Sequence, residues 1–285
     1  MLMAIHITVC SQIYFSKRYN NEGLWSYSQN ILEHSSGYFL SFVTPGINSQ
    51  SRRIGFLSLD FNGNIMGPAK IYTDLESSVE TGYPGSFIKL GEDSNYACLG
   101  TKMKGVPEGR YDRGWLLKLN NSLDTIWTKM YTDDPPHDTS ILFRNFRELS
   151  DGGYIAVGLV NPVSGTGFFR IGMFRLDDAG TLLWKRVYGT GNIHFQPFDV
   201  SPTSDKGYII GAIYEPLNGP STQGDDPYII KIDSVGNQQW NLHLGNPDCR
   251  ENYAMVDLAR DGNIQVGTIF SDTCWSDDVW MARIN

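Results

Sequence analysis

Basic residues are scarce in this chain of 285 residues, in which 23 Lys and Arg stand against 31 Asp and Glu. The formal charge is therefore −8. A protein that binds nucleic acid or an anionic membrane needs a basic surface to neutralise phosphate, so the sequence favours neither partner. Charged residues make up only 19% of the chain, whereas aromatic residues reach 13% and glycine 30 residues. This composition is typical of a strand-rich globular protein and argues against disorder or a coiled coil.

Cysteine is also scarce, with four residues in the whole chain. Neither a CxxC pair nor a Cys/His cluster with zinc spacing is present, so we expect no structural zinc site. Cys98 lies in an apolar run and is expected to be a buried free thiol. Cys249 and Cys274 lie in polar loop sequence, and a disulfide between them fits an exported protein.

A long hydrophobic run is absent, and the apolar residues 1–11 are too short to span a bilayer. Val9 and Ser11 have the spacing that a signal peptidase accepts, which predicts a clipped secretory signal and a secreted, cell-surface or periplasmic protein. The segment lacks the basic start of such signals, so an apolar N-terminal strand is the alternative. Cys10 also suggests a lipoprotein anchor, although Val9 is unusual there. We expect residues 12–285 to form one domain.

A repeat of about 56 residues runs through the chain, and it decides the expected fold. Its clearest copy joins Asp151-Gly-Gly-Tyr-Ile-Ala-Val-Gly, a run from Ile171 to Trp184, and Lys185-Arg-Val-Tyr-Gly. The first block recurs at intervals of 58, 58, 54 and 56 residues, at Tyr38, Tyr96, Tyr154, Tyr208 and Ile264. Five units are therefore present.

Each unit contains four short apolar runs separated by Gly, Asn and Asp, with no helical period. Four-stranded units repeated around an axis predict an all-β, five-bladed β-propeller of antiparallel blades. The fifth unit ends with its third run at Asn285, whereas residues 13–19 match a fourth run. The N-terminal strand is therefore expected to complete the last blade and close the ring. An open solenoid is the alternative, and it would leave exposed sheet edges.

The blocks Gly-Tyr-Ile, Tyr228-Ile-Ile-Lys-Ile-Asp-x-x-Gly-Asn and Trp-x-x-x-Tyr-Gly resemble those of secreted β-propeller repeat proteins of Bacteroidetes. The resemblance covers nearly all of residues 13–285. Such proteins often use type IX secretion and carry a C-terminal sorting domain, which this sequence does not show. Their function is mostly unassigned, so the resemblance implies no catalytic residues.

In such blades the connections on one side of the disc are tight turns, and those on the other side vary in length. The long segments are 44–53, 73–83, 104–113, 132–139, 161–170, 215–227 and 271–278. Variable loops on a rigid scaffold are the usual place for function. This loop face is rich in acidic and aromatic residues. The expected ligand-binding residues are Tyr111, Asp133, Asp134, His137, Phe168, His194, Asp225, Asp226 and Trp275.

Two functions remain open, and in both the protein is exported. The first is a non-catalytic scaffold that binds a glycan, peptide or protein through the loop face, with neither nucleic acid nor membrane insertion. The second is a glycoside hydrolase with carboxylates near the central opening, for which Glu148, Asp199 and Asp257 are scattered candidates. Asp199 and Asp257 are expected to occupy similar repeat positions and to be structural.

No cofactor or metal is expected, because a D-x-D-x-D-G calcium loop is absent, although clustered carboxylates suit Ca²⁺. Two residue series recur by unit and are expected to pack and ion-pair, with a fivefold ring of ligand sites as the alternative. They are Trp127, Trp184 and Trp240, and Lys118, Arg175, Lys231 and Arg283.

Overall fold

The structure is a computed structural model, and every element in its described part is a strand. It describes residues 16–19, 26–46, 51–73, 78–91, 95–106, 109–132, 139–162, 167–216, 225–244, 250–271 and 277–284. Over these ranges there is no helix long and apolar enough to cross a membrane.

The strands form five antiparallel sheets that follow one another along the chain. The first sheet contains β1 (Tyr27–His34), β2 (Gly37–Pro45), β3 (Arg52–Asp60) and β4 (Lys70–Tyr72). The second contains β5 (Ser78–Thr81), β6 (Phe87–Lys89), β7 (Tyr96–Val106), β8 (Gly109–Leu119) and β9 (Thr125–Tyr131). The third contains β10 (Thr139–Glu148), β11 (Tyr154–Pro162), β12 (Arg170–Leu176) and β13 (Leu182–Tyr188). The fourth contains β14 (Ile193–Pro202), β15 (Tyr208–Pro216), β16 (Asp226–Ile232) and β17 (Gln238–His243). The fifth contains β18 (Arg250–Leu258), β19 (Ile264–Ser271) and β20 (Asp277–Ile284).

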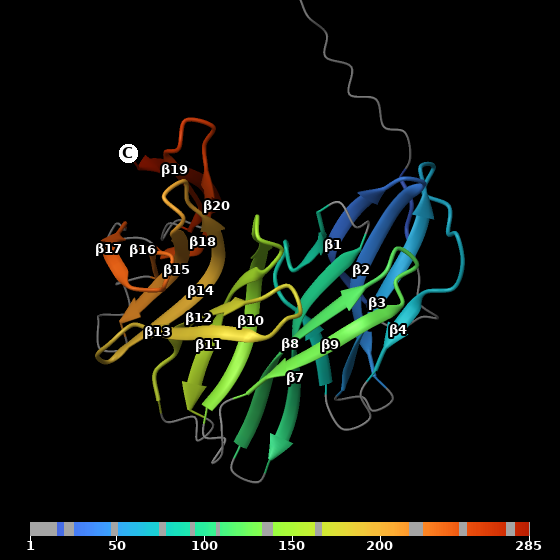
Figure 1. Cartoon of the computed structure of the whole chain (residues 1–285), viewed down its shortest axis with the longest axis horizontal. Helices are drawn as coiled ribbons and strands as arrows, with labels where there is room; N and C mark the ends of the chain where they lie inside the picture. Colours follow the sequence, from blue (N-terminus) through green and yellow to red (C-terminus); the bar gives the residue numbers. More distant parts are fainter. Residues whose placement is uncertain are drawn as a thin grey trace, which may run out of the picture.

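The sheets are arranged as the blades of a β-propeller, fanned along an arc from β1–β4 to β18–β20 (Figure 1). This confirms the expected all-β repeat of antiparallel sheets. The second sheet departs from four simple strands, because its first strand is split into β5 and β6 by residues 82–86, and both pieces pair with β7.

The hydrophobic core lies between successive sheets rather than inside any one of them. In the central strands of the inner sheets, alternate side chains pack against the preceding sheet and the following sheet, as expected for strands covered on both faces. Phe174 of β12 packs against Leu99 and Leu116 of the second sheet. Met173, its neighbour on the opposite face, packs against Ile210 and Ile230 of the fourth sheet.

In the first three sheets, a tyrosine near the end of the outer strand ties that sheet to the next one. Tyr72, Tyr131 and Tyr188 donate their phenolic hydrogens to backbone carbonyls in the tight turn of the following sheet. Tyr131 bonds to Gly180 at 2.7 Å, and Tyr188 bonds to Gly236 at 2.7 Å. The repeat thus contains a conserved geometric link between neighbouring sheets.

Several members of the two repeated side-chain series occupy packing and ion-pairing positions, as predicted, whereas Trp240 is 36% exposed. Trp127 lies so close to Gly180 that a Cβ there would collide with the indole ring, and a Cβ on Gly236 would lie 3.2 Å from the ring of Trp184. The basic series pairs with the aspartate of the preceding tight turn. These ion pairs are Arg175–Asp151, Lys231–Asp205 and Arg283–Asp261.

The two ends of the arc present less completely covered faces. Met281 in β20 is 74% exposed, whereas Met173 and Ile229, at the same register position in β12 and β16, are fully buried. On the first sheet, Phe42 and Leu57 belong to a small apolar cluster. Tyr19, from the N-terminal part of the chain, packs against this cluster. Among the described strands, the fifth sheet has three, and it is not paired with the first.

Candidate functional site

The innermost strands of four sheets contain a bulge, and the residue after each bulge occupies the same register position. These residues are Asn30, Asn145, Asp199 and Met255, in β1, β10, β14 and β18. A bulge adds one residue, bends the strand and redirects its side chains. Three of the four positions therefore present a short polar side chain, and the fifth sheet presents a methionine.

Residues 82–86, which split the first strand of the second sheet, join these polar side chains. Gly85 donates its backbone hydrogen to Asn30 Oδ1 at 2.6 Å, and Asn145 Nδ2 donates to the carbonyl oxygen of Pro84 at 3.3 Å. Tyr83 donates its backbone hydrogen to the carbonyl oxygen of Arg144 at 2.8 Å. This turn, which we call the axial turn, therefore bridges the inner strands of the first and third sheets.

Asp199 is the buried acid of this inner region, with 3% of its surface exposed. Its Oδ1 accepts hydrogen bonds from Arg147 Nη2 at 2.7 Å, Asn145 Nδ2 at 3.0 Å and the Val200 backbone at 2.9 Å. Its Oδ2 accepts one from the Val256 backbone at 3.2 Å. Every one of these partners is a donor, which is the arrangement that an ionised carboxylate requires.

Burial raises the pKa of the Asp199 carboxyl, because the charged form loses its solvation. The positive charge of Arg147 and the N–H groups of Val256 and Val200 act in the opposite direction. The carboxylate thus connects the third, fourth and fifth sheets through Arg147, its own strand and Val256.

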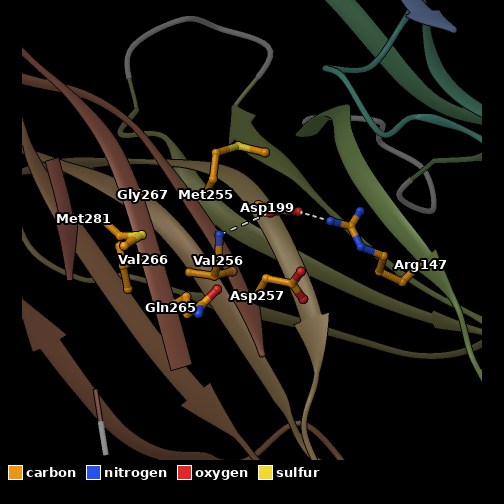
Figure 2. A pocket seen from close by; sticks show the side chains of 9 residues that line it. All are labelled: Arg147, Asp199, Met255, Val256, Asp257, Gln265, Val266, Gly267 and Met281. Atoms are coloured by element: carbon orange, nitrogen blue, oxygen red, sulfur yellow. Dashed lines mark hydrogen bonds and ion pairs between the residues drawn. The ribbon is translucent and has the colours of Figure 1, made fainter. Parts of the chain in front are cut away.

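A pocket of about 320 Å³ lies beside this carboxylate (Figure 2). Figure 2 shows Asp199 between Arg147 and the backbone of Val256, with Met255, Asp257 and Met281 nearby. The pocket is lined by Arg147, Asp199, Met255, Val256, Asp257, Gln265, Val266, Gly267 and Met281. It combines an ion pair on one side with methionine side chains of the fifth sheet on the other.

Asp199 and Asp257 do not occupy the same repeat position, and that expectation is wrong. Asp199 of β14 pairs with Gly211 of the neighbouring strand. The residue at the equivalent position of β18 is Met255, which pairs with Gly267. Asp257 lies two positions further along, where β14 has Ser201. The bulges shift the register, and a similar local sequence, Phe-Asp-Val against Val-Asp-Leu, concealed the difference.

Each of the three acids considered for hydrolysis accepts hydrogen bonds from the protein through at least one oxygen. Asp199 uses its oxygens in the contacts described above. Glu148 Oε2 accepts the backbone hydrogen of Gly91 at 2.8 Å, and Asp257 Oδ1 accepts the Ser201 hydroxyl at 3.3 Å and the Leu258 backbone at 2.8 Å. Within the described ranges, no group of three or more His, Cys, Asp or Glu is arranged to hold a metal ion.

Phe168 and His194, two of the residues predicted on the loop face, lie together. Their ring centroids are 5.7 Å apart, and the ring of Phe169 lies 4.3 Å from the same imidazole. His194 Nδ1 accepts the backbone hydrogen of Phe169 at 2.8 Å, which fixes the ring. Arg170 lies over the Phe168 ring at 5.4 Å and bonds to the carbonyl oxygen of Ile193.

Asp226 lies at the start of β16 and is paired with a residue that the sequence did not suggest. Its Oδ2 is 2.7 Å from His243 Nε2, and the imidazole contacts the ring of Tyr214 at 4.5 Å. Oδ1 of Asp226 is buried and has no hydrogen-bond partner. Asp225 precedes it at the partly buried beginning of the strand. Sequence reasoning missed His243 because it lies within a predicted outer strand.

Tyr111 is not an exposed loop residue, and this expectation is wrong. The segment expected as a loop at 104–113 is largely an extension of the β7–β8 hairpin, and Tyr111 pairs with Lys104 in it. Only 9% of its surface is exposed. The remaining predicted residues, Asp133, Asp134, His137 and Trp275, lie outside the described residues, as do Cys249 and Cys274 of the expected disulfide.

Cys98 is a buried free thiol, as predicted. Burial raises its pKa, so the reactive thiolate is disfavoured. The residues of the inner region that sequence reasoning missed are Tyr83, Arg147 and Tyr253. One signal was available, because the Gly82-Tyr-Pro-Gly sequence breaks the apolar run that the other units keep.

Comparison with known proteins identifies no family for this chain. No family model matches, and no curated protein matches. Among solved structures, a Dyadobacter fermentans protein of unknown function superimposes with a TM-score of 0.63 at 10% identity, over 94% of this chain and 80% of that one. This likeness supports the fold alone.

Two glycan-degrading enzymes are more distant in structure. An endo-arabinase from Bacteroides thetaiotaomicron matches with a TM-score of 0.45 at 13% identity, over 90% of this chain and 93% of that one. A thermostable family-43 glycoside hydrolase matches with a TM-score of 0.46 at 11% identity, over 91% and 90%.

Proposed function

We propose that this protein is a closed five-bladed propeller that acts as an exported, non-catalytic scaffold and binds a glycan, peptide or protein through its loop face. The proposal that the protein is not a catalyst rests on the hydrogen bonds of Asp199. Its carboxylate is buried, and its two oxygens accept four hydrogen bonds from protein donors. A general acid or base must instead offer an oxygen to the substrate.

Ring closure is supported by the hydroxyl of Tyr19, which donates to the carbonyl oxygen of Gly63 at 2.9 Å. Tyr131 and Tyr188 make the same bond from an outer strand to the tight turn of the next sheet. Tyr19 therefore has the position of an outer-strand tyrosine in a sheet that precedes the first. In a ring of five sheets, that sheet is the fifth, which contains three described strands.

Binding at the loop face is supported by the aromatic and histidine side chains there. Phe168 and His194 form one group, and Tyr214 and His243 form another beside Asp226. Both groups combine ring surface with fixed polar atoms, which is the usual chemistry of a binding site. The loop segments themselves are the variable part of an otherwise regular repeat.

Export rests on the sequence of residues 1–11 and on the expected pair Cys249 and Cys274. The resemblance to secreted Bacteroidetes repeat proteins supports the same compartment. These residues lie outside the described part of the chain.

The alternative is a glycoside hydrolase, and one observation favours it. Asp199 is a buried acid with a raised pKa beside a pocket of about 320 Å³ that also contains Asp257. Perturbed acids in pockets are frequent at catalytic sites. Because the Asp199 carboxylate is already hydrogen-bonded within the protein, the binding scaffold is the better-supported function.

One experiment separates the two functions. The purified full chain is screened against immobilised glycans, polysaccharides and peptides, and released sugar is measured in the same wells. The scaffold predicts saturable binding without turnover. Reproducible sugar release would support the hydrolase, and absence of binding across the screen would remove the scaffold.

A further inference from the structure

Three aromatic rings from three different sheets meet beside the axial turn. Tyr83 of this turn stacks on Phe198 of β14, with ring centroids 5.3 Å apart and planes 18° apart. Tyr253 of β18 meets Phe198 edge to face at 4.9 Å and Tyr83 at 6.1 Å. The second, fourth and fifth sheets thus contribute one ring each to a single group, which we call the axial aromatic cluster.

Tyr253 adopts a backbone conformation that a bulky residue rarely takes, with φ at 91°. It lies in the bulge of β18, between Asn252 and Met255. Such a conformation is strained and persists where the surrounding structure imposes it. Tyr253 is nevertheless 42% exposed. Packing alone therefore does not account for the tyrosine, and its exposed ring is available to a ligand.

The Tyr83 ring of the cluster and the axial turn that carries it are held in place by several contacts. Arg144 lies 4.6 Å from the centre of the Tyr83 ring and bonds through its carbonyl oxygen to the Tyr83 backbone. Gly85 and Pro84 are fixed to Asn30 and Asn145 by the bonds already described. A binding surface that is held in place before the ligand arrives loses little conformational entropy on binding.

The chemistry of the cluster indicates its ligand. Its exposed part is the ring of a tyrosine, which offers an apolar face and a hydroxyl at one edge. A pyranose ring has a matching face of C–H groups surrounded by hydroxyls that can bond to the polar edge. The chain carries a formal charge of −8, which disfavours an anionic polysaccharide.

We infer that the axial aromatic cluster is a carbohydrate subsite in which a neutral sugar ring stacks on Tyr253. This inference rests on the proposed binding function and specifies the class of its ligand. The position suits the loop face, since Tyr253 lies near the beginning of β18.

The test uses the full chain and three variants. Tyr253→Gly removes the ring and relieves the positive φ, so it is expected to fold, whereas Tyr253→Trp keeps a stacking ring. Phe61→Ala is the matched control, because Phe61 is 48% exposed and lies in a tight turn after β3. The probes are cellotetraose, mannotetraose and maltotetraose, with tetraproline as the peptide probe, followed by titration calorimetry and saturation-transfer NMR.

The inference predicts that at least one tetrasaccharide binds the wild type and that Tyr253→Gly weakens this binding by about tenfold or more. Tyr253→Trp and Phe61→Ala should bind as the wild type does. Saccharide binding that is unchanged in Tyr253→Gly would overturn the subsite while leaving the binding function intact. Binding of tetraproline alone would assign the cluster to peptides and would also overturn it. Failure of all four probes would overturn the carbohydrate subsite, and the broader screen then decides the binding function separately.

Discussion

Tyr19 and Gly63 are joined by a hydrogen bond of 2.9 Å from the phenolic hydroxyl to the backbone carbonyl oxygen, across 44 residues of sequence. Tyr131 makes the equivalent bond to Gly180 between two complete sheets. If the N-terminal strand is part of the ring, the two bonds are equivalent in energy as well as in geometry.

The first prediction compares Tyr19→Phe with Tyr131→Phe. Each substitution removes one hydrogen bond, and each should reduce the free energy of unfolding by about 0.5–1.5 kcal/mol. Chemical denaturation of the two variants checks this. A cost at Tyr131 with none at Tyr19 would mean that the N-terminal segment does not contribute to the stability of the ring.

Deletion of residues 1–19 is the second test of closure. Without these residues, the fifth sheet keeps an unpaired edge and Met281 remains exposed, so the truncated protein should associate and lose solubility. Size-exclusion chromatography with light scattering measures this. A monomeric truncation product as stable as the full chain would contradict ring closure.

The third prediction concerns Asp199. Replacement by Ala leaves Arg147 and the donors of Asn145 and Val256 without an acceptor, so the protein should lose about 3–5 kcal/mol of stability. Asp257→Ala is the matched control, because its carboxylate is exposed, and it should cost much less. Thermal and denaturant unfolding give both values. Equal and small losses would mean that the Asp199 network does not hold the sheets together.

Gly85 provides the fourth prediction. Its φ is 98°, and a Cβ there would lie 3.0 Å from Asn145 Oδ1, so Gly85→Ala should destabilise the protein by about 1–3 kcal/mol. Gly91→Ala is the control, because its Cβ would meet only ordinary contacts to Glu148. Similar unfolding curves for the two variants would show that the axial turn adapts without strain.

Asp205 makes the stability of the fourth sheet depend on pH. Its hydrogen bonds from Lys231 and from Thr203 lower the pKa of the carboxyl to about 2, from an ordinary value of 3.8. Since the folded pKa is depressed, the contribution is complete above pH 3.8 and is lost as the pH falls towards 2. Unfolding of the wild type and Asp205→Asn between pH 5 and pH 2 tests this. The difference between them should shrink in acid, and a constant difference would contradict the ion pair.

The repeated features were predictable from sequence because the same residue types recur at the same positions of successive units. The tight turns, the basic residue opposite Asp151 and Asp205, and the tryptophan against the next sheet all recur at a fixed spacing. A position that recurs from unit to unit reports the demands of the shared architecture more reliably than any single residue does.

The inner region was predicted less well, because its irregularities lie where the repeat is broken. Bulges displace Asp199 relative to Asp257, and a single added residue leaves little trace in the sequence. Among the inner strands that the structure describes, only the first strand of the second sheet is split by such a turn, so Tyr83 has no counterpart there to reveal it. Tyr111 was misassigned because a long hairpin and a loop have similar composition in this chain.

We propose that this propeller binds a ligand without cleaving it, and one measurement tests this proposal most directly. The glycan or peptide that binds most tightly is incubated with the wild type, and bound ligand and newly formed chain ends are quantified over time. We predict stable binding with no increase in chain ends. An increase in ends that Asp199→Asn abolishes, with ligand binding retained, would contradict the account and identify a hydrolase.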